Sequence, residues 1–148
     1  MVELEGRHIE GLAAALRADF FVDEEALRLA IGPLGSCNLV HRGTGFKVDL
    51  FVRRERPFSR SEMQRRMQVE LAGGLRLDVA TAEDCVLTKL EWFEKGGRVS
   101  DRQWRDVLGV LRISGDGLDR AYLARWAQEL GLDELLAAAM REAFGASR

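Results

Sequence analysis

The sequence FKVDLFV, residues 46–52, is the clearest β-strand pattern in the chain. β-Branched and aromatic residues alternate with other types at period two, and glycines before the stretch and Pro57 after it bracket a strand. Successive side chains of a strand point to opposite faces of a sheet. The pattern therefore predicts two sets: Phe46, Val48, Leu50 and Val52 on one face, and Lys47, Asp49 and Phe51 on the other.

Asp49 is the best candidate for a functional side chain in this strand. A carboxylate in mid-strand costs desolvation energy unless it is exposed, paired or bound to a metal ion. One interpretation makes Asp49 a metal ligand and catalytic residue. The other makes it structural, through an ion pair with Lys47 or an arginine, or through an exposed sheet face. The sequence leaves both open.

The whole chain has the composition of a folded domain. It has 148 residues, of which 47% are hydrophobic and 31% charged, and its formal net charge is −2. These values exclude a disordered chain and give no global signal for nucleic-acid binding. No apolar run approaches the roughly 20 residues that span a bilayer, and no signal-peptide pattern begins the chain, so we expect a cytoplasmic protein without membrane contact. Cys37 and Cys85 lack metal-site or redox-motif spacing and are expected to be buried thiols.

The elements before residue 81 alternate between helix and strand. Met1 to Leu4 resembles a strand end or a leader. We expect helices over residues 7–16 and 24–31, a short helix from Ser59 or Ser61, and strands over residues 19–23, 36–42, 46–52 and 75–80.

The turn at residues 43–45 predicts a hairpin between residues 36–42 and the Asp49 strand. If Arg42 pairs with Phe46, His41 faces Lys47, and both lie on one face with Asp49. A slip of one residue would move His41 to the opposite face, so the cluster depends on the register. A surface strand residue is the preferred interpretation of His41.

From residue 81 onward the pattern is helical. Four helices are expected, opened by Thr81, Ser100, Asp119 and Asp133 as N-caps. The sequence therefore predicts an α+β fold: a small mixed β-sheet with helices over residues 1–80, followed by a helical bundle over residues 81–148. The two halves can share one core.

Residues 53–66 contain six arginines against two glutamates. Such a run is usually a solvated face, and RNA binding is the minority interpretation. The acidic balance of the chain and the lack of interleaved aromatic residues argue against RNA.

Three segments together resemble the nucleotidyltransferase superfamily, in particular its minimal bacterial branch and the AbiEii toxin-like proteins. They are FKVDLFV at residues 46–52, VATAEDCVLTKL at residues 79–90 and RQWRDVL at residues 102–108. The resemblance covers roughly residues 35 to 145. It implies that Asp49 is the third metal-binding carboxylate of a Mg²⁺ site, and that Lys47 and Lys89 reach phosphates of a nucleoside triphosphate. Asp106 belongs to the third segment, where Arg102 or Arg105 can also pair with it.

The family also carries a Gly-Ser motif followed by an Asp-x-Asp strand, and neither is found in suitable positions here. The resemblance places Met1 about where that first strand ends, as in a truncated form or one with a misplaced start. We therefore expect a nucleotidyltransferase fold that is catalytically incomplete. The alternative is a non-enzymatic module that forms a homodimer or binds a protein partner, for example in a toxin–antitoxin pair. An exposed edge strand near the N-terminus would favour this alternative, because pairing with another chain would cover it.

Overall fold

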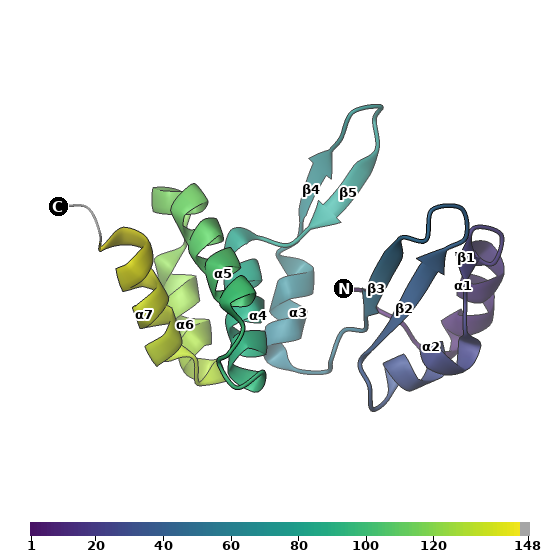
Figure 1. Ribbon diagram of the computed structural model, residues 1–148, viewed down its shortest axis with the longest axis horizontal. Helices are drawn as coiled ribbons and strands as arrows, with labels where there is room; N and C mark the ends of the chain where they lie inside the picture. The colour runs from purple at the N-terminus through teal and green to yellow at the C-terminus, as the bar shows by residue number, and fades with distance from the viewer. Residues whose placement is uncertain (146–148) are drawn as a thin grey trace. The chain divides into compact units, whose positions relative to one another are not determined.

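The chain is an α+β protein with helices and two small antiparallel sheets (Figure 1). A computed structural model describes residues 1–145. It divides the chain into two compact units, Met1–Met63 and Gln64–Arg148. The boundary between the units lies after Met63, whereas the sequence suggested residue 80. Strands β4 (Met67–Glu70) and β5 (Arg76–Val79) therefore belong to the same unit as the helical bundle that follows them.

The first unit contains a three-stranded antiparallel sheet in the order β1-β2-β3. The expected helices and strands are present in it, several with shorter bounds, but the third helix begins at Pro57, before the expected start at Ser59 or Ser61. The elements are η1 (Gly6–His8), α1 (Ile9–Leu16), β1 (Phe20–Phe21), α2 (Glu24–Ile31), β2 (Ser36–His41), β3 (Lys47–Phe51) and α3 (Pro57–Gln64).

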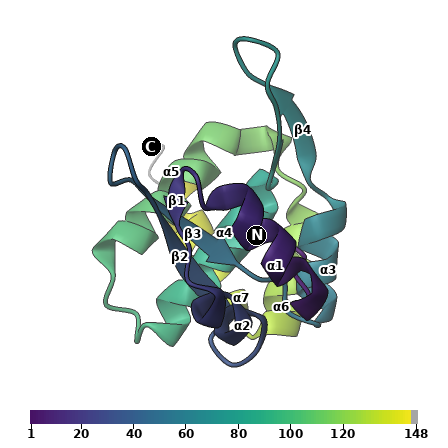
Figure 2. The ribbon, with the colours of Figure 1, turned by 90° about the vertical axis from the view of Figure 1, so that its right-hand side faces the viewer.

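Helices α1 and α2 lie beside the sheet (Figure 2). Their hydrophobic side chains pack on one of its faces. Ile9 and Ala13 of α1 and Leu27 of α2 form the buried centre, and Cys37 of β2 and Leu50 of β3 pack against it. Side chains of a strand alternate, so the neighbouring positions on β2 and β3 belong to the opposite face. That face, which we call the open face, carries the exposed side chains of Lys47 and Asp49.

The start of the chain pairs with the end of β3. Val2 forms a parallel bridge with Val52: the Val2 amide donates to the Phe51 carbonyl at 2.8 Å, and the Arg53 amide donates to the Val2 carbonyl at 2.8 Å. Residues 1–4 thus behave as a strand end. In the described part of the chain, no other strand pairs with β3 along its outer edge.

The second unit contains the hairpin β4 (Met67–Glu70) and β5 (Arg76–Val79), followed by a helical bundle. Helix α4 packs against α5, α6 and α7. The bundle consists of α4 (Ala82–Lys95), α5 (Asp101–Ser114), η2 (Gly115–Gly117), α6 (Arg120–Leu130) and α7 (Asp133–Phe144). None of the helices within residues 1–145 has the length and apolar character needed to cross a membrane.

Three of the four expected helix caps are confirmed. The side chains of Thr81, Ser100 and Asp119 accept hydrogen bonds from backbone amides in the first turns of α4, α5 and α6. The fourth expectation is wrong, because Asp133 is already the first helical residue and Leu132 occupies the cap position without a side-chain bond. The negative charge of Asp133 still favours the helix start, since the N-terminal end of a helix dipole is positive.

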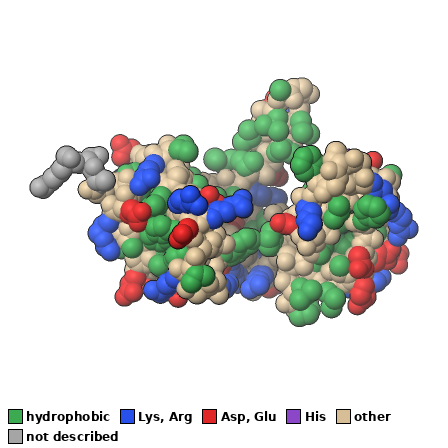
Figure 3. All heavy atoms as spheres, in the orientation of Figure 1, with side chains coloured by type: hydrophobic (Ala, Val, Ile, Leu, Met, Phe, Trp, Pro, Cys, Tyr) green, Lys and Arg blue, Asp and Glu red, His purple; other side chains and the backbone are tan. Residues whose placement is uncertain are grey.

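The β4–β5 hairpin has one apolar face that is open to solvent (Figure 3). Its pairs alternate between apolar ones, such as Val69 with Leu77, and polar ones, such as Glu70 with Arg76. The sequence pattern predicted β5 but not β4, which follows the arginine-rich run directly. Exposed side chains of the apolar face include Met67 (51%), Val69 (37%), Leu71 (45%), Leu75 (57%) and Leu77 (43%).

Candidate functional site

Asp49 lies in the middle of β3 on the open face of the first sheet. Its cross-strand partner is Asn38 of β2, whose side-chain amide donates a hydrogen bond to Oδ1 of Asp49. Both residues are exposed. A solvated carboxylate with one amide partner pays little desolvation energy, so the structural interpretation of Asp49 as an exposed strand residue needs no metal ion.

The hairpin register differs from the expected one by one residue. Val40 pairs with Lys47 and Leu39 with Val48, while His41 exchanges hydrogen bonds with the backbone around Phe46. The turn therefore spans four residues, 42–45, where the sequence suggested three. The expected cluster of His41 with Lys47 and Asp49 is wrong.

His41 instead lies on the opposite face from Asp49, where its ring meets that of Phe20 edge-on at 5.2 Å. Its Nδ1 is 2.8 Å from the Thr44 hydroxyl and accepts the Thr44 amide at 3.2 Å. These local bonds stabilise the four-residue turn and account for the register. His41 is thus a half-buried residue at the end of β2, where a surface strand residue was expected, and its ring contacts Phe20 and Thr44.

Lys47 remains beside Asp49, two positions earlier on the same face. It is exposed, and no residue of the described chain forms an ion pair or hydrogen bond with its ammonium group. Phe21 of β1 pairs with Val40, which pairs with Lys47, so these residues form one row across the three strands. The open face thus presents the carboxylate of Asp49, the ammonium group of Lys47 and the 58% exposed ring of Phe21.

Arg42 completes this surface at the hairpin end of β2. Its guanidinium carbon lies 4.1 Å from the centroid of the Phe21 ring. Its Nε donates to the carbonyl oxygens of Arg17 and Phe20, both at 3.1 Å. No sequence pattern indicates Phe21 or Arg42 as site residues, because β1 is only two residues long and its register with β2 has no sequence signal.

The open face offers few ligands for a metal ion. Within residues 1–145, no three His, Cys, Asp or Glu side chains are grouped closely enough to hold one. Asp49 supplies one carboxylate, and Asn38 would add an oxygen only if its amide were turned over. These residues fit a cation that is held mainly by water and substrate phosphates, which is how Mg²⁺ is often bound. They do not fit a site built from protein carboxylates alone.

Lys89 belongs to α4 in the second unit, where its ammonium Nζ lies 2.8 Å from Oδ2 of Asp106 on α5. Neither Arg102 nor Arg105 makes this contact. The hydrogen bond and the charge of Lys89 hold the pKa of Asp106 below its ordinary value. The pair links α4 with α5, and Lys89 therefore already has a protein partner.

Several arginines of the basic run also have acidic partners. Arg53 pairs with Glu3 at 2.8 Å and with Glu55, and Arg66 pairs with Asp78 at 3.7 Å. These contacts favour the interpretation of the run as an ordinary surface and weaken the RNA interpretation.

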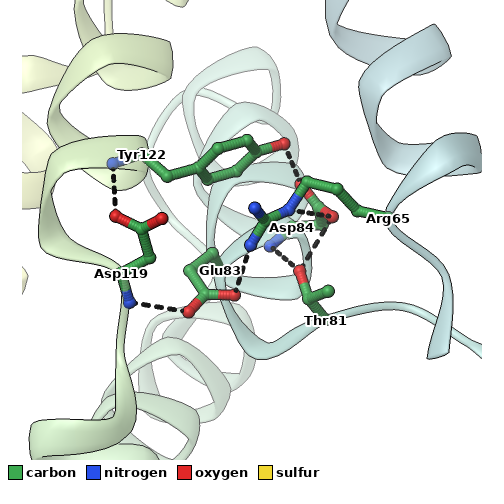
Figure 4. A network of polar contacts seen from close by, with 6 residues as sticks. All are labelled: Arg65, Thr81, Glu83, Asp84, Asp119 and Tyr122. Carbon is green, nitrogen blue, oxygen red and sulfur yellow. Dashed lines mark hydrogen bonds and ion pairs between the residues drawn. The ribbon is translucent and has the colours of Figure 1, made fainter.

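A second set of polar residues lies at the start of α4 (Figure 4). Asp84 is fully buried, and its carboxylate accepts hydrogen bonds from the Thr81 hydroxyl at 2.8 Å and the Tyr122 hydroxyl at 2.5 Å. Arg65 lies 3.8 Å from the same carboxylate and also 3.8 Å from the centre of the Tyr122 ring. A buried carboxylate needs such partners, because an unpaired one would be strongly destabilising.

Glu83 connects this set to the start of α6. Its carboxylate accepts the Asp119 backbone amide at 2.8 Å and pairs with Arg65 at 3.2 Å, while Asp119 itself caps α6 (Figure 4). Burial raises the pKa of Glu83, but the amide bonds, the Thr81 hydroxyl and the charge of Arg65 outweigh it and lower that pKa below its ordinary value.

The geometry gives these acidic residues a structural role. Their oxygens are directed to protein donors, and the contacts join the first turns of α4 and α6 to Arg65. The sequence showed Glu83 and Asp84 within a helix-start motif. It gave no sign of Tyr122 and Arg65 as their partners, because these lie far away along the chain.

Comparison of the chain with protein-family models, curated proteins and solved structures found no match in any of the three.

Proposed function

We propose that this chain is a nucleotidyltransferase-type domain that binds a nucleoside triphosphate with Mg²⁺ on the open face and lacks the full set of catalytic carboxylates. Asp49 would be the metal ligand, and Lys47 would contact the phosphates. The observation that carries the proposal is their arrangement: an exposed carboxylate, and two positions away an ammonium group without a partner among residues 1–145, on the sheet face opposite α1 and α2.

The chemistry of the open face supports a binding role more than a complete reaction centre. In nucleotidyl transfer, Mg²⁺ neutralises charge on the transferred phosphate and activates the attacking hydroxyl. A single protein carboxylate leaves most of the metal's ligands to water and phosphate. Asp49 can therefore help to hold a metal–nucleotide complex, whereas positioning a second metal ion or an acceptor would need further acidic ligands. Lys89 is not included, because Asp106 already neutralises it.

Calorimetric titration of the 148-residue protein with each nucleoside triphosphate, with and without Mg²⁺, tests this proposal. We expect binding that depends on Mg²⁺ and that Asp49→Asn abolishes with little change in the thermal midpoint, since Asp49 is exposed. Asp116→Asn removes the same charge from a fully solvated position and serves as the control. Binding by Asp49→Asn as tight as that of the parent protein would reject Asp49 as the ligand.

The exposed β4–β5 hairpin favours a second candidate function, a non-enzymatic module that forms a homodimer. Two-stranded sheets are only marginally stable alone in water, and an uncovered apolar face with open edges on both strands is a typical interaction surface. The apolar face consists of similar aliphatic side chains throughout, so two copies related by a two-fold axis would be complementary to each other.

Analytical ultracentrifugation tests this second candidate function by measuring whether the protein is a monomer or a dimer. A dimer that dissociates when Leu75 and Leu77 are both replaced by serine would support it. Leu34→Ser is the control, because Leu34 is 60% exposed outside the hairpin. A wild-type protein that stays monomeric at its highest soluble concentration would exclude dimerisation through this face.

A further inference from the structure

The Arg42 side chain is held in place although it is exposed. Two backbone carbonyls accept its Nε–H, and the Phe21 ring lies against its guanidinium group. Its terminal nitrogens have no ion-pair or hydrogen-bond partner in the described part of the chain. An arginine that is fixed in this way loses little conformational entropy when it binds a ligand, and its outer N–H groups suit the oxygens of a phosphate.

Lys47 is the nearest cation on the same face. Val40 pairs with Lys47, and Arg42 follows Val40 by two positions, as the first residue of the turn after β2, with its guanidinium group over Phe21 of β1. Diagonal positions in a regular antiparallel ladder are about 7–8 Å apart and within reach of long side chains, so basic groups from positions close to this arrangement can contact one extended anion such as a polyphosphate. Asp49 follows Lys47 two positions along β3, on the side away from Arg42.

We propose that Arg42 and Lys47 together bind the polyphosphate group of the ligand, with Phe21 as a positioning residue for Arg42. The order of groups along the open face agrees with this assignment. A polyphosphate between Arg42 and Lys47 extends towards Asp49, where a divalent cation would contact both the carboxylate and the phosphate oxygens. Only the placement of this cation rests on the proposed function, because the two basic side chains bind phosphate without it.

The test uses the full-length chain and inorganic tripolyphosphate without metal, followed by each nucleoside triphosphate with Mg²⁺. We expect calorimetric binding of tripolyphosphate that weakens about tenfold or more in Arg42→Met and in Lys47→Met, because each change removes a charge-assisted contact. Phe21→Leu is expected to weaken binding about threefold by releasing Arg42, with an unchanged thermal midpoint.

Matched controls are available in the same unit. Arg28→Met removes an exposed arginine of α2 whose contacts are with glutamates, and Phe46→Leu shortens an exposed aromatic side chain on the opposite face of the hairpin. Both are expected to bind tripolyphosphate like the wild-type protein. Circular dichroism of each variant confirms that it is folded.

The outcomes separate the two proposals. Tripolyphosphate binding that depends on Arg42 and Lys47, without Mg²⁺-dependent nucleotide binding, would support the phosphate site and reject the proposed function. Mg²⁺-dependent nucleotide binding that depends on Asp49 and Lys47 but not on Arg42 would support the proposed function and reject the phosphate site. Absence of tripolyphosphate binding by the wild-type protein, or wild-type affinity in Arg42→Met and Lys47→Met, overturns the phosphate site.

Discussion

The hydroxyl of Tyr122 on α6 donates a hydrogen bond of 2.5 Å to the carboxylate of Asp84, which is fully buried at the start of α4. The Arg65 guanidinium group lies 3.8 Å from the Asp84 carboxylate and 3.8 Å from the centre of the Tyr122 ring. One tyrosine thus satisfies a buried charge and provides an aromatic surface for a cation. This explains how the helical unit tolerates a carboxylate in its interior.

Removing this hydroxyl should destabilise the protein measurably. Tyr122→Phe keeps the ring beneath Arg65 but leaves Oδ1 of Asp84 without its phenolic donor. Leaving a buried acceptor unsatisfied costs about 1–3 kcal/mol, so we expect the free energy of unfolding in urea to fall by that amount. In the double variant Tyr122→Phe, Asp84→Asn, the loss from the tyrosine change should be smaller. Additive losses would show that the two side chains are not coupled.

Glu83 should make stability depend on pH in the acidic range. Hydrogen bonds and Arg65 lower its pKa in the folded protein below the ordinary value of 4.5. The unfolded chain therefore binds a proton first as the pH falls. The stabilisation from Glu83 is present above pH 4.5 and is lost as the pH falls through the folded-state pKa.

Urea unfolding measured between neutral and acidic pH checks this prediction. Glu83→Gln should be less stable at neutral pH, and its stability should decline less steeply in acid than that of the wild-type protein. Glu129→Gln removes an exposed carboxylate that pairs with Arg125 and should leave the slope unchanged. The prediction is wrong if Glu83→Gln and the wild-type protein give parallel curves.

Cys37 and Cys85 are partly buried, where the sequence predicted buried thiols, and both should be slow to react in the folded protein. Burial and then the charge of Asp23 raise the pKa of the Cys37 thiol, and burial is the largest cause of the raised pKa of Cys85. The thiolate is the reactive form, so both residues are expected to react with Ellman's reagent about tenfold or more slowly than in the urea-unfolded chain. Reaction at equal rates would show that the thiols are accessible and unperturbed.

Local patterns predicted much of the fold. Helix starts were visible because Thr81, Ser100 and Asp119 are side chains that bind their own first-turn amides. The alternation around Asp49 identified both the strand and its two faces. Helix caps and strand alternation involve only residues that are close together in the sequence, so one sequence is enough to predict them.

Non-local features were missed or misplaced. The register of β2 and β3 depends on a four-residue turn stabilised by His41 and Thr44, and a difference of one residue moved His41 to the other face. Strand β4 follows a run of arginines that suggested a solvated surface. The partners of Asp84 and the contact of Arg42 with Phe21 arise only when distant segments meet. The candidate residues Asp49 and Lys47 could be found from the sequence, whereas their neighbour Arg42 could not.

The pairing of Lys89 with Asp106 leads to the last prediction, which separates a structural lysine from a phosphate-binding one. The hydrogen bond from Lys89 is the largest cause of the lowered pKa of Asp106, and the charge of Lys89 is the next. Lys89→Met should therefore raise the Asp106 pKa towards its ordinary value of 3.8, as followed by NMR titration of the carboxyl carbon. Lys95→Met, which breaks the pair with Glu91, is the control and should leave the Asp106 pKa unchanged.

Nucleotide and tripolyphosphate binding should be the same in Lys89→Met as in the wild-type protein. Loss of binding in this variant, without loss of folding, would instead assign Lys89 to the ligand, as the resemblance to nucleotidyltransferases implies.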